Sequence, residues 1–101
     1  MIVYNETIKV TWEIHDNWML WMKSSHIPDI LATGLFEDYR MMRLLEVDET
    51  DGPTYAVQYT ARSAADYNRY IAEFSTEIRD RSYEKWGANF IAFRSVLQVV
   101  N

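Results

Sequence analysis

The chain has 101 residues, of which 49% are hydrophobic and 15% aromatic, so it is long enough for one domain with a substantial core. The net charge of −5 argues against nucleic-acid binding, which normally needs a basic surface. No apolar run is long enough to predict a membrane span. The absence of cysteine excludes disulfides and a thiolate nucleophile, and without a visible secretory signal we expect a cytoplasmic protein.

The first predicted strand covers residues 2–12, where apolar and polar side chains alternate with the period of two that is typical of a pleated strand. Glu6 interrupts the apolar row. Either a bulge turns this side chain outward, or the carboxylate is partly buried and has a partner.

A helix is expected to begin at Asp16 or Asn17, because both residue types cap helix N-termini well. Pro28 should end or kink this helix, since proline lacks an amide donor. The next strand lies within residues 36–47. Its apolar groups fall on both faces, which indicates a bulge or a strand that is buried on both sides.

The second half of the chain begins with a strong turn signal at residues 51–53 and a clean alternating strand at residues 54–61. A second helix should begin after Ser63, which resembles the start of a capping box, and end at Gly87. The last strand covers residues 90–100. Its apolar side chains point to both faces: Ile91, Phe93, Leu97 and Val99 to one, and Phe90, Ala92, Val96 and Val100 to the other.

This order of elements, strand–helix–strand–strand–helix–strand, predicts a ferredoxin-like α+β fold. In that fold two helices cover one face of a four-stranded antiparallel sheet. Apolar residues on the uncovered face would then be exposed, and such a patch usually marks a contact surface. We therefore expect a homodimer in which the open sheet faces of two copies pack together.

Several short runs along the whole chain also carry a family resemblance. They are residues 1–5 (MIVYN), Trp21-Met22, His26-Ile27-Pro28, Thr33-Gly34, residues 55–59 (YAVQY) and Phe93-Arg94. Together they resemble the short bacterial proteins of domain-of-unknown-function family 4286 (DUF4286), whose first strand is usually apolar where this chain has Glu6. The element order is similar to that of the dimeric α+β barrel superfamily. The resemblance implies a ferredoxin-like protomer and a barrel-forming dimer but no particular activity, because that superfamily includes cofactor-independent monooxygenases, haem-degrading enzymes and chlorite dismutases.

The candidate catalytic residues are His26, Tyr59 and Arg94. His26 lies near a predicted helix end, where it could be a general base, a haem ligand or a cap of a free carbonyl. Gln58 and Arg94 are polar residues in apolar segments. They could orient an anionic or carbonyl-bearing ligand, or they could pair with each other or with Glu6. The candidate ligand-binding residues are Glu6, Trp21, Gln58 and Arg62.

Neither a metal site nor a cofactor is expected. His15 is interpreted as a surface residue, it shares no metal-ligand spacing with His26, and the acidic residues 46–51 do not match a calcium loop. The sequence therefore predicts a non-catalytic ligand-binding or interaction module. The alternatives are a cofactor-independent monooxygenase or isomerase that acts on a small hydrophobic substrate, or a haem-binding protein.

Overall fold

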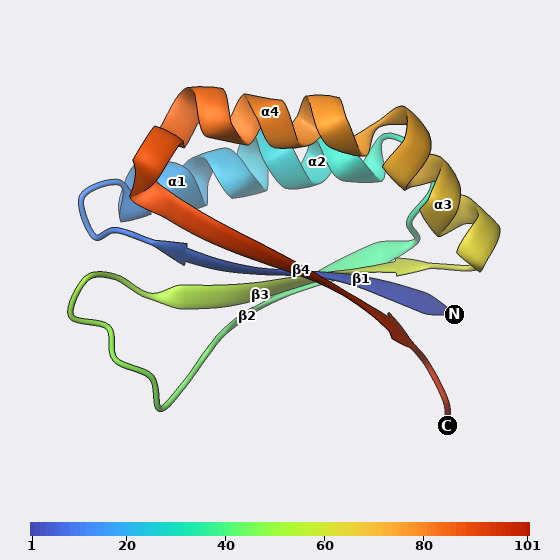
Figure 1. Cartoon of the computed structure of the whole chain (residues 1–101), viewed down its shortest axis with the longest axis horizontal. Helices are drawn as coiled ribbons and strands as arrows, with labels where there is room; N and C mark the ends of the chain where they lie inside the picture. The colour runs from blue at the N-terminus through green and yellow to red at the C-terminus, as the bar shows by residue number, and fades with distance from the viewer.

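A computed structural model describes all 101 residues and confirms the ferredoxin-like α+β fold. The elements in chain order are β1 (Ile2–Val10), α1 (His15–Trp21), the π-helical η1 (Met22–His26), α2 (Ile27–Leu31), β2 (Asp38–Arg43), β3 (Thr54–Ala61), α3 (Ala64–Glu73), α4 (Ser75–Trp86), the 3-10 turn η2 (Gly87–Asn89) and β4 (Phe90–Gln98). The antiparallel sheet has the strand order β2-β3-β1-β4. All helices lie on one of its faces (Figure 1). None of them has the length and apolar character that a bilayer-spanning helix needs.

The helix-facing side of the sheet forms the core through an aromatic cluster. Tyr4 of β1 lies opposite Tyr59 of β3 in the strand register, and their ring centroids are 5.9 Å apart. Tyr70 of α3 lies 5.6 Å from Tyr4 and 4.9 Å from Phe36. These rings join the two layers, because each layer contributes part of the same buried stack.

Glu6 lies in the same helix-facing row of β1, two residues beyond Tyr4. The pairing of β1 with both neighbouring strands continues without interruption through this position, where Glu6 lies opposite Val57 and Arg94. No bulge turns the side chain outward. Of the two interpretations of Glu6, the partly buried carboxylate is therefore the one that the fold adopts.

Of the two outcomes predicted for Pro28, an end or a kink of the first helix, the end does not occur. α1 continues through η1 into α2, and Pro28 lies in the first turn of α2. Within this continuous run Pro28 has no amide hydrogen to donate, so the backbone hydrogen bonding is irregular at this point. The irregularity takes the form of the π-helical turn, which lies immediately before the proline.

The second helix begins as predicted, but it consists of two parts. The Ser63 hydroxyl accepts a hydrogen bond of 3.1 Å from the Asp66 amide, which confirms the N-cap. The chain then breaks at Phe74, where φ is −126°, and α4 follows. The Ser75 hydroxyl donates to the Ile71 carbonyl at 2.8 Å, and such serine back-bonding is known to bend helices. The apolar periodicity of α3 and α4 is nearly continuous, so the sequence pattern did not reveal the break.

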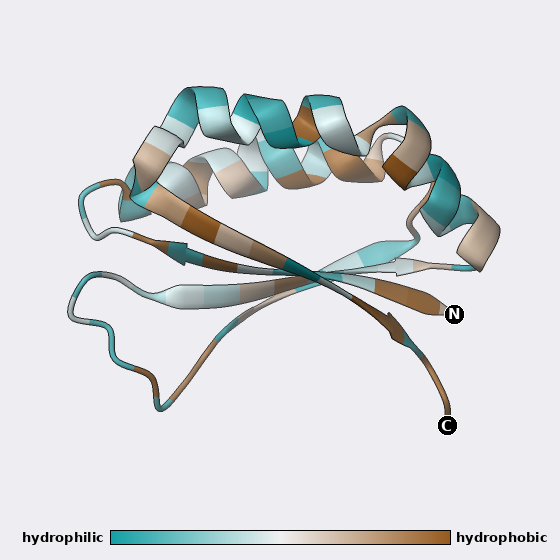
Figure 2. Cartoon of the chain, in the orientation of Figure 1, coloured by the Kyte–Doolittle hydropathy of each residue, from teal (hydrophilic) through white to brown (hydrophobic).

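The uncovered face of the sheet is apolar along β4, as predicted. Ile91, Phe93 and Leu97 are 59%, 67% and 45% exposed, and the register places them opposite the odd-numbered residues of β1. Figure 2 shows apolar residues along β4 and in the loop between β2 and β3. That loop and the C-terminal end both extend beyond the sheet on the side without helices (Figure 1). We call this surface the open face.

Gly52 is the glycine at which the fold least tolerates a side chain. A methyl group there would lie 1.7 Å from the backbone oxygen of Val10, whereas Gly34 has open space and a φ of +77°. We expect Gly52→Ala to lower the free energy of unfolding by more than about 2 kcal/mol. The control Gly34→Ala should cost only about 1 kcal/mol, from backbone strain. Urea denaturation measures both losses, and equal losses would contradict the packing of Gly52 against β1.

Candidate functional site

A cavity of about 170 Å³ lies between the helix-facing side of the sheet and the helices. Residues of β1, β4, α1, η1, α3 and α4 surround it. Most of its wall is aromatic or aliphatic, with contributions from Trp18, Trp21, Tyr70, Trp86 and Phe90. A concave, mainly apolar pocket with a few polar groups is typical of a small-molecule site.

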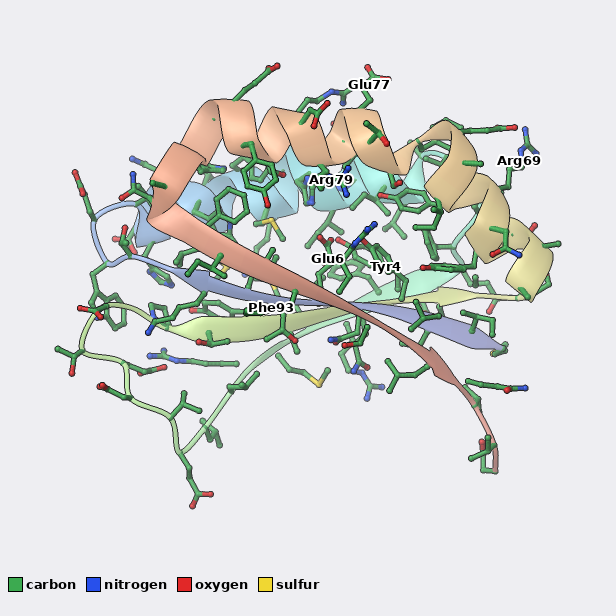
Figure 3. All side chains as sticks on the ribbon, viewed as in Figure 1. Tyr4, Glu6, Arg69, Glu77, Arg79 and Phe93 are labelled. Carbon is green, nitrogen blue, oxygen red and sulfur yellow. The ribbon has the colours of Figure 1, made fainter.

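Glu6 and His26 are the polar groups at the base of this cavity. Their side chains are only 15% and 6% exposed, and Oε1 of Glu6 lies 3.9 Å from Nε2 of His26. The separation is too long for a direct hydrogen bond, but a single ligand could contact both groups. In Figure 3 the Glu6 side chain points from β1 toward the helices. The pair is therefore close, largely dehydrated and not closed by a mutual hydrogen bond.

Local structure explains how His26 reaches the cavity. It is the last residue of η1, and its ring stacks on Trp21 with a centroid separation of 4.7 Å. A π-helical turn shifts the faces of the helix on either side of it, and such turns occur frequently at functional sites. The wide turn thus directs the imidazole inward. His26 faces this pocket, so the structure does not support its interpretation as a cap of a helix end.

Two arginines contribute positive charge to the cavity. Arg79 of α4 and Arg94 of β4 are exposed overall but line the pocket, and in Figure 3 Arg79 lies on the sheet-facing side of α4. Neither arginine makes an ion pair. The arginines that do are Arg43, Arg62, Arg69 and Arg81. Arg94 lies opposite Glu6 in the register, yet the structural Glu6–Arg94 pair that was considered above does not form.

The buried tyrosines beside the pair retain their protons. Burial raises the pKa of Tyr4, and the negative charge of Glu6 raises it further, while Arg94 acts in the opposite direction. The pKa of Tyr70 is raised by burial and by Glu6 in the same way. Both hydroxyls are therefore neutral and able to donate a hydrogen bond. Since Glu6 and Arg94 affect both tyrosines, these four side chains form one electrostatic environment.

The structure brings together four of the residues proposed from the sequence. Glu6, Trp21, His26 and Arg94 all line the cavity. The other three candidates lie outside the lining: Tyr59 is fully buried in the core, Gln58 lies opposite Asn5 on the open face, and Arg62 forms an ion pair with Glu37. His15 is not a free surface residue either, because its ring is hydrogen-bonded to the Tyr55 hydroxyl at 2.7 Å.

Arg79 is the site residue that sequence reasoning missed. A usable signal was present, because the residues of α4 that line the cavity repeat at intervals of three and four. They are Ser75, Ile78, Arg79, Ser82, Tyr83 and Trp86. Such spacing defines one face of a helix. A charged residue such as Arg79 on the sheet-facing side of a helix is therefore expected to line a pocket, not to extend into bulk solvent.

Tyr59 provides a test of the electrostatics around the site. Its hydroxyl is buried without a hydrogen-bond partner, and burial raises its pKa well above the usual value. We expect Tyr59→Phe to raise the free energy of unfolding at pH 8 by about 1 kcal/mol, because an unsatisfied hydroxyl is removed.

The gain from Tyr59→Phe should be larger at pH 10.5. Above about pH 10 the unfolded chain ionises its tyrosines while the folded chain keeps Tyr59 protonated, so the native protein loses stability as the pH rises. Phenylalanine removes that contribution. Urea denaturation of both proteins at the two pH values measures the difference. A destabilised Tyr59→Phe variant would show that the hydroxyl has a partner in solution.

Comparison with solved structures shows the same fold in several proteins. The chain superimposes on an antibiotic biosynthesis monooxygenase with a TM-score of 0.69 and 14% identity, covering 100% of both chains. It matches a dimeric ferredoxin-like protein from an uncultured marine organism with a TM-score of 0.70 and 10% identity, covering 99% of this chain and 95% of the other. A dimeric ferredoxin-like protein of unknown function from Jannaschia sp. CCS1 matches with a TM-score of 0.60 and 18% identity, covering 98% of this chain and 100% of the other. At these identities the likeness establishes the fold alone.

Sequence comparison is more specific about family. No curated protein matches the chain. However, the sequence model of one family, described as "Domain of unknown function (DUF4286)", matches residues 1–100. The match covers nearly the whole chain and confirms the resemblance seen in its short runs. The chain therefore belongs to the DUF4286 family.

Proposed function

We propose that this protein is a homodimeric binding module for a small anionic ligand with a flat, apolar body. One observation carries the proposal. Arg79 and Arg94 line a cavity with a largely aromatic wall, and neither makes an ion pair. The chain as a whole carries a net charge of −5. Two cationic groups that face an apolar pocket in an acidic protein favour a ligand that has both an anionic group and an apolar surface.

The size of the cavity limits the ligand to about one ring and its substituents. An engineered protein cavity of about 150 Å³ accommodates benzene, and this cavity measures about 170 Å³. An aromatic ring would contact Trp18, Trp21 and Trp86 while its carboxylate reaches the arginines. Haem is several times larger than this volume, so the geometry does not favour the haem-binding alternative.

The charge of Glu6 further restricts the ligand. A second negative group near the base of the cavity would be repelled by this carboxylate, whose side chain is only 15% exposed. A neutral polar group there could instead contact Glu6, His26 and the hydroxyl of Tyr70. The site is therefore suited to a monoanion whose far end carries a neutral hydrogen-bonding group.

The dimer is proposed to form through the open face, with a second copy of the chain as the partner. Phe93, Ile91 and Leu97 expose a large apolar area there, and contiguous patches of this kind usually mark interfaces. Two proteins of the same fold are described as dimeric. The loop between β2 and β3 and the C-terminal end extend on this side of the sheet (Figure 1), where they could contact a second sheet.

A polar row across the middle of the open face supports a specific, twofold arrangement. Arg40, Gln58, Asn5 and Ser95 are neighbours in the strand register. Arg40 is exposed and makes no ion pair within the chain. The same row in a second copy would provide acceptors for this guanidinium. Polar groups within an apolar interface fix its register.

The ligand-binding proposal is tested with benzoate as the probe. We expect isothermal titration calorimetry to detect binding of benzoate but not of the uncharged benzyl alcohol. Arg94→Gln and Arg79→Gln should each weaken benzoate binding by about 10- to 100-fold, because each removes a charged hydrogen bond.

Arg69→Gln is the matched control for benzoate binding. Arg69 is an exposed helical arginine that pairs with Glu73 on α3 and lies outside the cavity. Its substitution should leave the affinity unchanged. An equal loss in all three variants would show that general charge, not the cavity, attracts the anion.

The dimer is tested by two substitutions of equally exposed side chains. Phe93 on the open face and Leu20 on α1 are both 67% exposed. Phe93→Glu should convert the dimer into a folded monomer in sedimentation velocity, because a charge would be buried in the apolar interface. Leu20→Glu should leave the dimer intact. A monomeric wild-type protein at micromolar concentration would overturn the proposed assembly.

A further inference from the structure

We propose, on the basis of the ligand-binding function above, that Glu6 and His26 are an acid–base pair that interconverts the keto and enol forms of the bound anion. The protein would then be a cofactor-independent tautomerase. The substrate class is a 2-oxo acid that has an aryl or other flat apolar group on the carbon next to the carbonyl. Three features of the structure support this inference.

The first feature is the energetic cost of Glu6. Its carboxylate lies in the apolar, helix-facing row of β1 and is largely dehydrated. It makes no hydrogen bond in the structure, and the one basic side chain within 4 Å of it is His26, at 3.9 Å. Buried carboxylates that stabilise a fold are closely paired, and this one is not. Local departures from good packing of this kind are expected at functional sites.

The second feature is the position of His26. Stacking on Trp21 and burial hold the ring in one orientation, and the π-helical turn places it opposite Glu6. A fixed imidazole and a fixed carboxylate about 4 Å apart can reach neighbouring atoms of a single substrate. Proton transfer requires each group to come within hydrogen-bond distance of its atom, and a carbonyl oxygen and the adjacent carbon satisfy this requirement together.

The third feature is the positive charge in the lining of the pocket. Arg94 and Arg79 line the cavity together with Glu6 and His26. A carboxylate bound by these arginines places the rest of the substrate among the aromatic side chains. The carbonyl and its neighbouring carbon then lie near the pair, where the proton of Tyr70 and the positive charge of Arg94 stabilise negative charge on oxygen.

The proton transfer balances without any other reactant. The Glu6 carboxylate takes the proton from the carbon next to the carbonyl, and the electron pair of that C–H bond becomes the C=C bond. The electrons of the carbonyl π bond move to oxygen, which receives a proton from the protonated His26 imidazole. The enol is then complete. The proton on Glu6 returns to His26 across their short separation, and the pair is restored for the next turnover.

Phenylpyruvate in D2O is the probe for this activity. Proton NMR follows the loss of its CH2 signal as deuterium replaces hydrogen, and calorimetry measures its affinity. We expect the wild-type protein to accelerate exchange at least 100-fold over Glu6→Gln and over His26→Gln, within the range for general acid–base catalysis. Both variants should bind phenylpyruvate within about threefold of the wild-type affinity, since the arginines are unchanged. Circular dichroism confirms that each variant is folded.

Two further variants separate catalysis from binding. Glu13→Gln, which changes an exposed carboxylate outside the cavity, should exchange like the wild type. Arg94→Gln should raise the concentration of phenylpyruvate needed for half-maximal exchange. If phenylpyruvate and benzoate bind but exchange is no faster than in buffer, the acid–base inference fails while the binding proposal stands. If neither anion binds, both fail. Unchanged exchange in a folded Glu6→Gln or His26→Gln variant also overturns the inference.

Discussion

The contact between Tyr4 and Tyr70 is the interaction on which the rest of the site depends. It joins the central strand to the helical layer with a ring separation of 5.6 Å and sets how closely the layers approach at that point. Phe36 and Tyr59 extend the stack away from β4. On the β4 side aromatic pairs such as Tyr83 and Phe90 line the cavity instead of filling the space. Dense packing on one side of the interlayer space thus leaves a pocket on the other.

The electrostatics of the pocket follow from the same geometry. Glu6 is next to Tyr4 in the helix-facing row, so its carboxylate lies at the boundary between the aromatic stack and the open volume. Burial and the Glu6 charge together keep the hydroxyls of Tyr4 and Tyr70 protonated. The acidic chain thereby concentrates two free arginines, a carboxylate and an imidazole in one small apolar space. In such surroundings charges interact more strongly than they do in water.

The sheet uses its two faces for different purposes. The helix-facing side holds the core and the cavity, whereas the open face presents apolar side chains along β4 and a polar row through its centre. The two surfaces alternate residue by residue along each strand, because successive side chains of a strand point in opposite directions. Arg94 and Phe93 illustrate this division: neighbours in sequence, they belong to the pocket and to the proposed interface respectively.

The sequence by itself determined the order of elements, the two-sided character of β4 and the family. Strand periodicity, the Ser63 cap and the turn at residues 51–53 are local properties, and local properties can be read from one chain. It also placed Glu6, Trp21, His26 and Arg94 among the candidate site residues. Only the tertiary structure decided which of these meet. Three features bring His26, Arg79 and Arg94 around Glu6: the π-helical turn, the break at Phe74 and the strand register. All three features depend on packing between segments that are distant in sequence. For the same reason three other candidates from the sequence lie elsewhere. Tyr59 is in the core, Gln58 is on the open face, and Arg62 is in an exposed ion pair.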